Sequence, residues 1–450
     1  MRYRPALQIF TTFFILIIVA ALLLYSFGFS PSFQRPTGIS ALFTATSAVC
    51  VTGLTVVNLS SEMTFGGQLI VLIFIQLGGL GLLSLSNWIL LSLSGRIGAN
   101  RTAITGEILG TLPQMSASSL LRRVAWFTGL AEMAGAVILF IRFEGEYPPG
   151  EAIWLAVFHS ISAFCNAGFS LFSDSLMHYR SDLVLNLTIM ALIVLGGIGF
   201  VAAADIVEKI EAMARRKRRK LCLHTNVVLT FSAVLISSAT VAFLIFEWGN
   251  PVFHESLPNR FFESLFLAVT SRTAGFNTVE TCHLTNMTLL TLMFLMFVGA
   301  SPGSTGGGIK TTTLAIGWAL LKARLLNRPR SEIFKRSIPY DLTAKALAVV
   351  VLYVVTVILA LGVLEATEFG EMPHIATRGM FLDYLFEVLS AMSTVGLTTG
   401  VTTKLSHYGL WVIMLCMFIG RIGPLVLVSS VIGKRSRQQY SYPEGDMMVG

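Results

Sequence analysis

Charged residues are scarce in this chain. Asp, Glu, Lys and Arg make up 12% of its 450 residues, against roughly 25% in an average soluble protein. Apolar residues make up 54% of the chain, and its mean hydropathy is +0.74. This composition excludes a soluble globular protein and a disordered chain. The length would suit two or three soluble domains, but the long apolar stretches predict one membrane domain that crosses the bilayer repeatedly.

Residues typical of catalytic and metal sites are also few. The five cysteines form no CxxC pair and the seven histidines are scattered, so we expect no zinc site, redox motif or disulfide scaffold. HExxH does not occur in the sequence, and the histidines form no acid–base or metal constellation, which argues against an intramembrane enzyme. The sequence contains no dinucleotide-binding or other soluble regulatory segment, so we expect no cofactor bound to this chain.

Basic residues are unevenly distributed. Lys and Arg number 32 against 24 Asp and Glu, which gives a net charge of +8. Most bases gather in five places and the acids concentrate in the loops between them, a pattern typical of membrane proteins with positive cytoplasmic loops. We therefore expect both termini and three loops to be cytoplasmic, and we interpret the run 215–220 as a topology anchor rather than a nucleic-acid patch. The five places are Arg2 and Arg4; Arg96, Arg101, Arg122 and Arg123; residues 209–220; residues 322–345; and residues 434–437.

Eight apolar segments are long enough to cross a membrane. Each has about twenty residues or more, which as a helix covers a hydrocarbon core of roughly 30 Å. The first follows two arginines, as a signal peptide would, but it is too long for a signal-peptide core and no small-residue cleavage site closes it. We expect spans at residues 9–29, 68–94, 120–142, 183–209, 226–247, 287–323, 340–364 and 408–432.

A shorter segment lies between the two spans of each successive pair. It is moderately apolar, contains Ser and Thr, and ends in Gly followed by Leu or Phe; at about ten to fifteen residues it predicts a re-entrant helix. The four glycines, Gly53, Gly168, Gly275 and Gly396, are 115, 107 and 121 positions apart. This spacing indicates a fourfold internal repeat. The predicted fold is an all-α membrane protein with eight transmembrane helices around a pseudo-fourfold pore, in repeats 1–95, 96–222, 223–325 and 326–450.

The repeated glycines suggest a chemistry for the centre of this fold. Irregular backbone at membrane depth is tolerated where it is buried in protein or lines a water-filled cavity. Glycine permits positive φ and close backbone approach, so four such turns around an axis could present a ring of carbonyl oxygens that replaces the hydration shell of a cation. The alternative is that the four glycines are loop residues with no joint role; their near-equal spacing after similar segments argues against it.

These segments resemble the pore loops of the Trk/Ktr/HKT superfamily of potassium transporters. The matching motifs are Ser47-Ala-Val-Cys-Val-Thr-Gly53-Leu54, Asn166-Ala-Gly168-Phe169, Ser271-Arg-Thr-Ala-Gly275-Phe-Asn-Thr278 and Ser393-Thr-Val-Gly396-Leu397. Eight spans, without an extra N-terminal pair, are most similar to a KtrB-type membrane subunit. The resemblance implies K⁺ filter positions at Val51, Thr52 and Gly53; Asn166, Ala167 and Gly168; Thr273, Ala274 and Gly275; and Thr394, Val395 and Gly396.

The same resemblance implies potassium uptake through a channel-like pore in a bacterial plasma membrane, with Na⁺ as a candidate activator. It further implies a homodimer of the membrane subunit and a separate cytosolic ring of the KtrA type that binds ATP, ADP or a dinucleotide. Only the glycine is common to all four loops, so our hypothesis is one well-formed ion site and weaker discrimination of K⁺ from Na⁺ than in tetrameric channels.

The second span of each repeat carries a cluster of small residues. In the first two repeats, Leu77–Gly81 and Leu195–Gly199, we interpret the cluster as a helix contact. The third is too rich in Gly and Pro to remain helical, and its position inside a span argues against a phosphate-binding loop. We expect a broken helix over about residues 299–313 that obstructs the pore together with Arg421, whose role could equally be structural. The gate residues are Gly299, Ala300, Ser301, Pro302, Gly303, Ser304, Thr305, Gly306, Gly307, Gly308, Lys310 and Arg421.

Two other functions remain open. A secondary cation symporter with stoichiometric coupling would usually show inverted repeats and intramembrane acids, whereas these repeats run in one direction and only Glu132 and Asp205 are expected within spans. A membrane scaffold without transport is the second. Outside the pore, we expect Arg272 to pair with an extracellular acid such as Glu263, and His159 to be a packed, hydrogen-bonded side chain.

Overall fold

The computed structural model describes residues 5–30, 37–94, 117–253, 256–370, 372–373 and 375–423. The bases Arg2, Arg4, Arg96 and Arg101, the run 434–437, and the end of the last predicted span at 424–432 lie outside the described residues. The described part is mainly helical, with one short antiparallel hairpin of β1 (Glu332–Ile333) and β2 (Arg336–Ser337).

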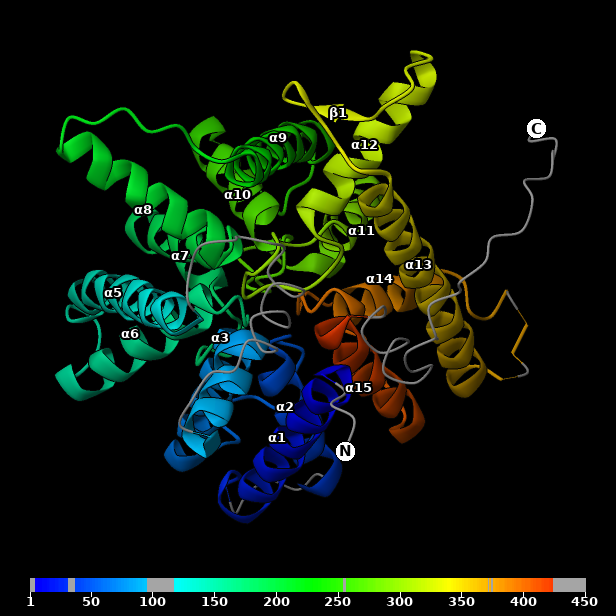
Figure 1. Ribbon diagram of the computed structural model, residues 1–450. Helices are drawn as coiled ribbons and strands as arrows, with labels where there is room; N and C mark the ends of the chain where they lie inside the picture. Colours follow the sequence, from blue (N-terminus) through cyan, green and yellow to red (C-terminus); the bar gives the residue numbers. More distant parts are fainter. Residues whose placement is uncertain are drawn as a thin grey trace.

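The helices follow one another around the centre of the molecule in four groups (Figure 1). Each group begins with a long helix, continues with a helix of 13 to 16 residues and ends with a further helix, which is broken in the second and third groups. The first group is α1 (Pro5–Phe27), α2 (Thr37–Cys50) and α3 (Phe65–Ser94); the second is α5 (Ala117–Phe143), α6 (Pro149–Phe164), α7 (Leu183–Gly197) and α8 (Phe200–Ala214); the third is α9 (Leu223–Phe246), α10 (Leu257–Thr270), α11 (Asn286–Phe297) and α12 (Thr311–Leu325); the fourth is α13 (Tyr340–Glu368), α14 (Met380–Met392) and α15 (His407–Ile422). Single 3-10 turns lie at Met177–Tyr179, Thr281–His283 and Thr402–Lys404.

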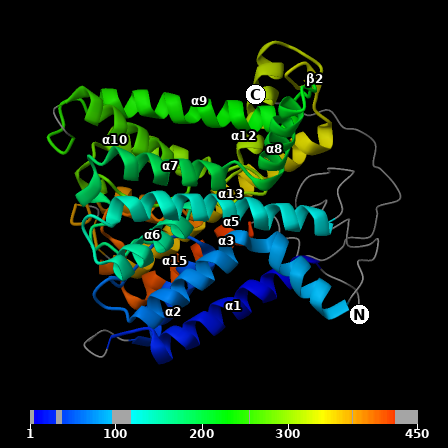
Figure 2. The same ribbon diagram turned by 90° about the vertical axis from the view of Figure 1, so that its left-hand side faces the viewer.

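The long outer helices have the composition of membrane spans. Among the described residues, four helices, α1, α5, α9 and α13, are long and apolar enough to cross a bilayer, and a fifth span results if α7 and α8 count as one. Their large apolar side chains, such as Ile15, Trp126 and Leu359, are more than half exposed, as lipid-facing side chains are. In Figure 2, α1, α5 and α9 run in broadly the same direction across the molecule. The short helices α2, α6, α10 and α14 lie inside them and bury most of their side chains.

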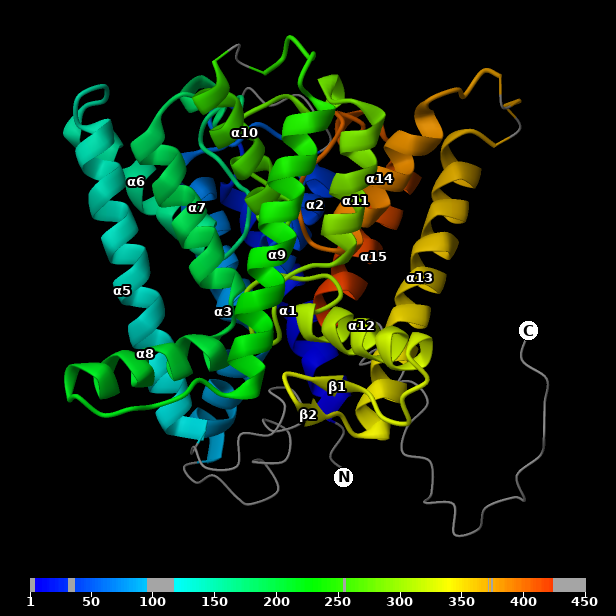
Figure 3. The same ribbon diagram turned by 90° about the horizontal axis from the view of Figure 1, so that it is seen from above.

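Two predicted spans are interrupted. The segment 183–209 is not one straight helix, because α7 and α8 meet at a bend of 104°. Gly199 at this bend has a φ of 91°, and the Phe200 amide donates to the carbonyl of Gly303, 2.9 Å away, rather than to its own helix. The interpretation of 195–199 as a plain helix contact is therefore incomplete. The segment 287–323 breaks between α11 and α12, as its Gly and Pro content predicts, and this break crosses the middle of the molecule (Figure 3).

A polar contact joins the two long helices of each group at the end of the molecule where the short helices begin. The residue at the start of each second helix makes it: Thr64 donates to the carbonyl of Phe27 at 2.8 Å, Thr285 to Glu247 at 2.8 Å and Ser406 to Glu368 at 2.6 Å. Side chains of this kind also cap the helix by accepting from its first amides. The contact fixes where each second helix begins relative to the end of the first.

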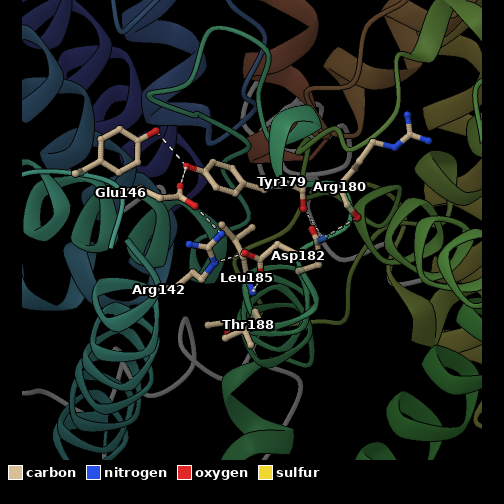
Figure 4. Close-up of polar contacts among 10 residues, drawn as sticks. Arg142, Glu146, Tyr179, Arg180, Asp182, Leu185 and Thr188 are labelled. Carbon is tan, nitrogen blue, oxygen red and sulfur yellow. Dashed lines mark hydrogen bonds and ion pairs between the residues drawn. The ribbon is translucent and has the colours of Figure 1, made fainter. Parts of the chain in front are cut away.

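The second group makes this contact with charged residues (Figure 4). Asp182 caps α7 by accepting from the Leu185 amide at 2.9 Å, and Arg142 at the end of α5 donates to the same carboxylate. Arg142 also pairs with Glu146 at 2.8 Å, and Glu146 accepts from the Tyr179 hydroxyl at 2.7 Å. The Tyr179 hydrogen bond and the Arg142 charge hold the pKa of the Glu146 carboxyl below its usual range.

Candidate ion pore

The four pore-loop glycines meet at the centre of the molecule. A Cβ placed on Gly53 would lie closer than 3.0 Å to the carbonyl oxygen of Ala167, and the same holds for Gly168 against Ala274, Gly275 against Val395, and Gly396 against Thr52. The chain of contacts passes from the first loop through the second and third to the fourth and returns to the first. The four glycines therefore form a closed ring in which each loop packs its backbone against the next.

The backbone of this ring is left-handed twice in each loop. The glycines have φ values of 91°, 69°, 82° and 92°, which glycine adopts without steric cost. The residue two positions earlier is not glycine, yet it also has a positive φ in every loop. For β-branched residues this conformation is strained, at a cost on the order of 1–3 kcal/mol each. The four residues are Val51 (56°), Asn166 (58°), Thr273 (76°) and Thr394 (49°).

Hydroxyl groups of the short helices hold the strained loops in place. Ser47 and Ser390, each six positions before its glycine, accept from the amides of Gly53 at 3.0 Å and Gly396 at 3.1 Å. Ser162, at the matching position of the second loop, donates to the carbonyl of Phe169 at 2.7 Å. In the third loop Thr270 donates to the carbonyl of Phe276 at 2.8 Å. Backbone amides of the loops also donate to carbonyls of the short helices. The loop carbonyls themselves stay at the ring, where each lies against the glycine of a neighbouring loop; they belong to Thr52, Ala167, Ala274 and Val395.

A cavity of about 380 Å³ opens above the ring, and we call it the vestibule. All four pore glycines line it together with Glu62 and Asp174, and no Lys or Arg lines it among the residues that the structure describes. Acidic walls around a confined space raise the local concentration of cations. The vestibule therefore favours the approach of a cation to the ring.

The segment between α11 and α12, residues 298–310, lies against the other side of the ring. A Cβ on Gly306 or Gly307 would collide with the hydroxyl oxygens of Thr273 and Thr394, respectively. The segment is held by the second group, because the amides of Ser301 and Thr305 donate to the carbonyls of Gly197 and Gly196, at 3.1 and 3.3 Å. It therefore lies directly beneath two of the four pore loops.

Two half-buried cations bind this segment through its carbonyl groups. Lys310 donates to the carbonyl of Gly306 at 2.7 Å. Arg421, in the last turn of α15, donates to the carbonyl of Thr305 and, on its other side, to that of Gly78 in α3. Arg421 thus joins the segment to the first and fourth groups. Neither cation has a carboxylate partner among the residues that the structure describes.

The structure brings the predicted residues together to different degrees. The twelve filter positions of the four loops converge, and the segment 299–308, Lys310 and Arg421 lie next to them. His159 is buried and contacts the carbonyl of Leu155 at 2.8 Å and the hydroxyl of Ser170 at 3.0 Å, as expected.

The predicted pairing of Arg272 with Glu263 is wrong. Glu263 pairs with Arg180 at 2.9 Å, because the loop after the second pore helix reaches α10. The bracing hydroxyls were not predicted, although their constant distance from the pore glycines is visible in the sequence of three of the four segments. The positive φ at the position two before each glycine has no common residue type that could reveal it.

The fold and this central site define a multi-pass membrane protein whose pore loops converge on one axis. The chain belongs to the TrkH family, described as "Cation transport protein", whose model matches residues 3–437. The family consists of transporters, so the expectation that this chain is not an enzyme is confirmed. The resemblance to KtrB-type subunits of the Trk/Ktr superfamily, and the location in the plasma membrane, are confirmed as well.

Named relatives cover the full length of the chain. It is 36% identical to "Ktr system potassium uptake protein B" of Bacillus subtilis, over 100% of this chain and 97% of the relative. It is 35% identical to "Potassium/sodium uptake protein NtpJ" of Enterococcus hirae, over 100% of this chain and 98% of the relative. The crystal structure of the potassium transporter TrkH from Vibrio parahaemolyticus matches with a TM-score of 0.71 at 20% identity, over 95% of this chain and 85% of that one. That likeness shows a shared fold.

Proposed function

We propose that this protein takes up potassium across the plasma membrane through a channel-like pore formed by four pore repeats. Eight transmembrane helices surround the pore. The end that carries α8 and the hairpin faces the cytoplasm, and we expect both termini to be cytoplasmic. The closed ring of Gly53, Gly168, Gly275 and Gly396 is the observation that carries the proposal. The names of the relatives support potassium, with sodium as a second ion or activator.

The ring provides the chemistry that a desolvated cation requires. Removing an ion from water without replacement costs tens of kcal/mol, and inward carbonyl oxygens offset this cost. The filter comprises the three residues of each loop that end in its glycine. The hydroxyls of Thr52 and Thr394 are buried without a hydrogen-bond partner within the described part of the chain, which suits oxygen atoms that coordinate a passing ion. Because the three-residue sequences differ between loops, we propose one well-formed K⁺ site and modest discrimination against Na⁺.

The segment 299–313 and Arg421 form the gate in this proposal. The segment lies under Thr273 and Thr394, where it obstructs the path of an ion that leaves the filter. Arg421 stabilises this closed position by bridging the segment to α3. Opening requires these carbonyl contacts to break.

Other subunits complete the system. We propose that the chain forms a homodimer and associates with a cytosolic ring of the KtrA type, which binds ATP, ADP or a dinucleotide. The name "Ktr system" of the relatives supports association with other subunits. The described bases of residues 209–220 and 322–345 lie at the end that we assign to the cytoplasm, where such a ring would dock. A cation symporter is the alternative; the same-direction order of the four groups favours the channel-like pore.

Uptake of rubidium into liposomes by the purified chain tests the proposal. We expect uptake driven by membrane potential alone, without a proton or sodium gradient, and competition by K⁺ stronger than by Na⁺. Strict coupling to a second gradient would favour the symporter, and no uptake in well-folded protein would contradict the proposed function.

A further inference from the structure

Three metal-binding side chains gather outside the pore, on the turn that follows the third pore loop. Glu280 precedes the 3-10 turn Thr281–His283, which carries Cys282 and His283. One ligand atom from each of the three residues lies within 4.8 Å of the other two. The Glu280 carboxylate is 2.9 Å from Nδ1 of His283, and Sγ of Cys282 is 3.8 Å from the same nitrogen.

These distances suit a tetrahedral metal ion. Bonds of about 2.0 Å to oxygen and nitrogen and about 2.3 Å to sulfur place tetrahedral ligand atoms roughly 3.3–3.6 Å apart. The two observed separations lie on either side of this range, so a small rotation of exposed side chains would complete the coordination. All three side chains are exposed, which leaves the fourth position open to water.

The backbone holds the turn in place before any metal binds. The His283 amide donates to the carbonyl of Glu280 at 3.2 Å. The side chain of Asn250, beyond the end of α9, donates to the carbonyl of His283 at 2.9 Å. Two residues later, Thr285 is fixed to Glu247 by the contact that starts α11. Ligands carried by a fixed turn lose little conformational freedom when they bind.

We propose that Glu280, Cys282 and His283 form a binding site for a thiophilic divalent cation such as Zn²⁺ or Cd²⁺. A thiolate with an imidazole and a carboxylate selects these ions over Mg²⁺ and Ca²⁺, which prefer oxygen ligands only. The thiol proton leaves to solvent when the Cys282–metal bond forms. The thiolate, the carboxylate and the metal then sum to zero charge, whereas the metal-free cluster with a neutral thiol and imidazole carries one negative charge.

Cadmium binding to the purified full-length chain tests the site. We expect a sulfur-to-cadmium charge-transfer absorbance that saturates at one Cd²⁺ per chain, is displaced by Zn²⁺ and persists in excess Mg²⁺ and Ca²⁺. Cys282→Ser should abolish it, and His283→Ala or Glu280→Gln should weaken binding at least tenfold. Cys222→Ser is the matched control, because Cys222 is the other cysteine that is not buried, and it should bind as the parent chain does.

Thermal unfolding provides a second measurement that does not involve transport. Zn²⁺ should raise the melting temperature of the parent chain and of Cys222→Ser, since a ligand that binds the folded state stabilises it. The increase should be absent in Cys282→Ser and His283→Ala. Absorbance that survives Cys282→Ser, or no saturable binding by the parent chain, would overturn the proposal.

The site lies close to the entrance of the pore. Asn277, three residues before Glu280, lines the vestibule. If the proposed function holds, the charge added by the metal weakens the attraction of the vestibule for K⁺. We expect bound Zn²⁺ to raise the KM for rubidium without changing the maximal rate, and high ionic strength to remove the effect. A KM that stays unchanged with metal bound would refute this coupling, whereas metal binding without any uptake would refute the proposed function alone.

Discussion

Arg421 donates a hydrogen bond to the carbonyl of Thr305, a residue 116 positions earlier in the chain. Its other nitrogen donates to the carbonyl of Gly78. One side chain therefore connects the central segment below the filter to the helices of the first and fourth groups. The Thr305 carbonyl lies in the break between α11 and α12, where no helix provides its partner, whereas the Gly78 carbonyl belongs to α3.

Removal of the Arg421 side chain should open the pore. Arg421→Ala deletes both contacts, so the segment 299–308 should leave its position more often and rubidium flux should rise several-fold. A deletion within 302–308 should act in the same direction, and the two changes together should be less than additive because they release the same segment. Liposome flux measures the effect. Lower thermal stability with unaltered flux would assign Arg421 a structural role only.

Serine at any pore glycine should damage the filter. Gly53, Gly168, Gly275 and Gly396 all have positive φ, and a Cβ at each would collide with the carbonyl of the next loop. We expect Gly→Ser at each position to reduce the preference for K⁺ over Na⁺ or to abolish uptake, as judged by rubidium uptake with competing sodium. Gly129→Ser is the matched control, since a Cβ there meets nothing within 4 Å. Unchanged selectivity at all four positions would refute the filter.

The bracing hydroxyls should control selectivity without touching the ion. In Ser390→Ala the buried amide of Gly396 loses its acceptor, at a cost of about 1–3 kcal/mol. The strained turn at Thr394 should then relax, and Na⁺ should compete better for rubidium uptake. Ser237→Ala, on the exposed side of α9, removes only a bond within its own helix and should leave competition unaltered. Equal effects of both variants would contradict this explanation.

The proposed orientation can be tested with a native side chain. Cys282 is exposed on the loop beside the vestibule, whereas Cys50, Cys165 and Cys416 are buried. A membrane-impermeant maleimide added to intact cells should therefore label the parent chain, and Cys282→Ser should lose most of the label. Labelling of Cys282 only after the membrane is permeabilised would place the vestibule in the cytoplasm and reverse the topology.

The convergence of the glycines was predictable because it follows from the repeat itself. Segments of one length and polarity, each preceding a second long helix, occupy equivalent positions wherever the copies surround an axis. Contacts made by only one copy were not predictable in this way. The bend at Gly199 depends on Gly303, and Glu263 pairs with Arg180 across two groups. In neither case does a local pattern identify the distant partner.

The strained residues of the ring also could not be predicted from the local sequence. Asn166 tolerates a left-handed conformation, but Val51, Thr273 and Thr394 adopt it against their intrinsic preference. Neighbouring loops impose this conformation, and its cause lies in the assembled ring rather than in any one segment. The repeat boundaries at 95, 222 and 325 and the cytosolic ring stay predictions from the sequence.

The segment below the filter continues directly into α12, a helix of 15 residues that ends just before the hairpin of β1 and β2. At 1.5 Å per residue, α12 is a rigid arm about 22 Å long. In the proposed gate, a force applied to the hairpin would therefore reach the obstructing segment directly, and a subunit outside the membrane would open the pore by tilting α12.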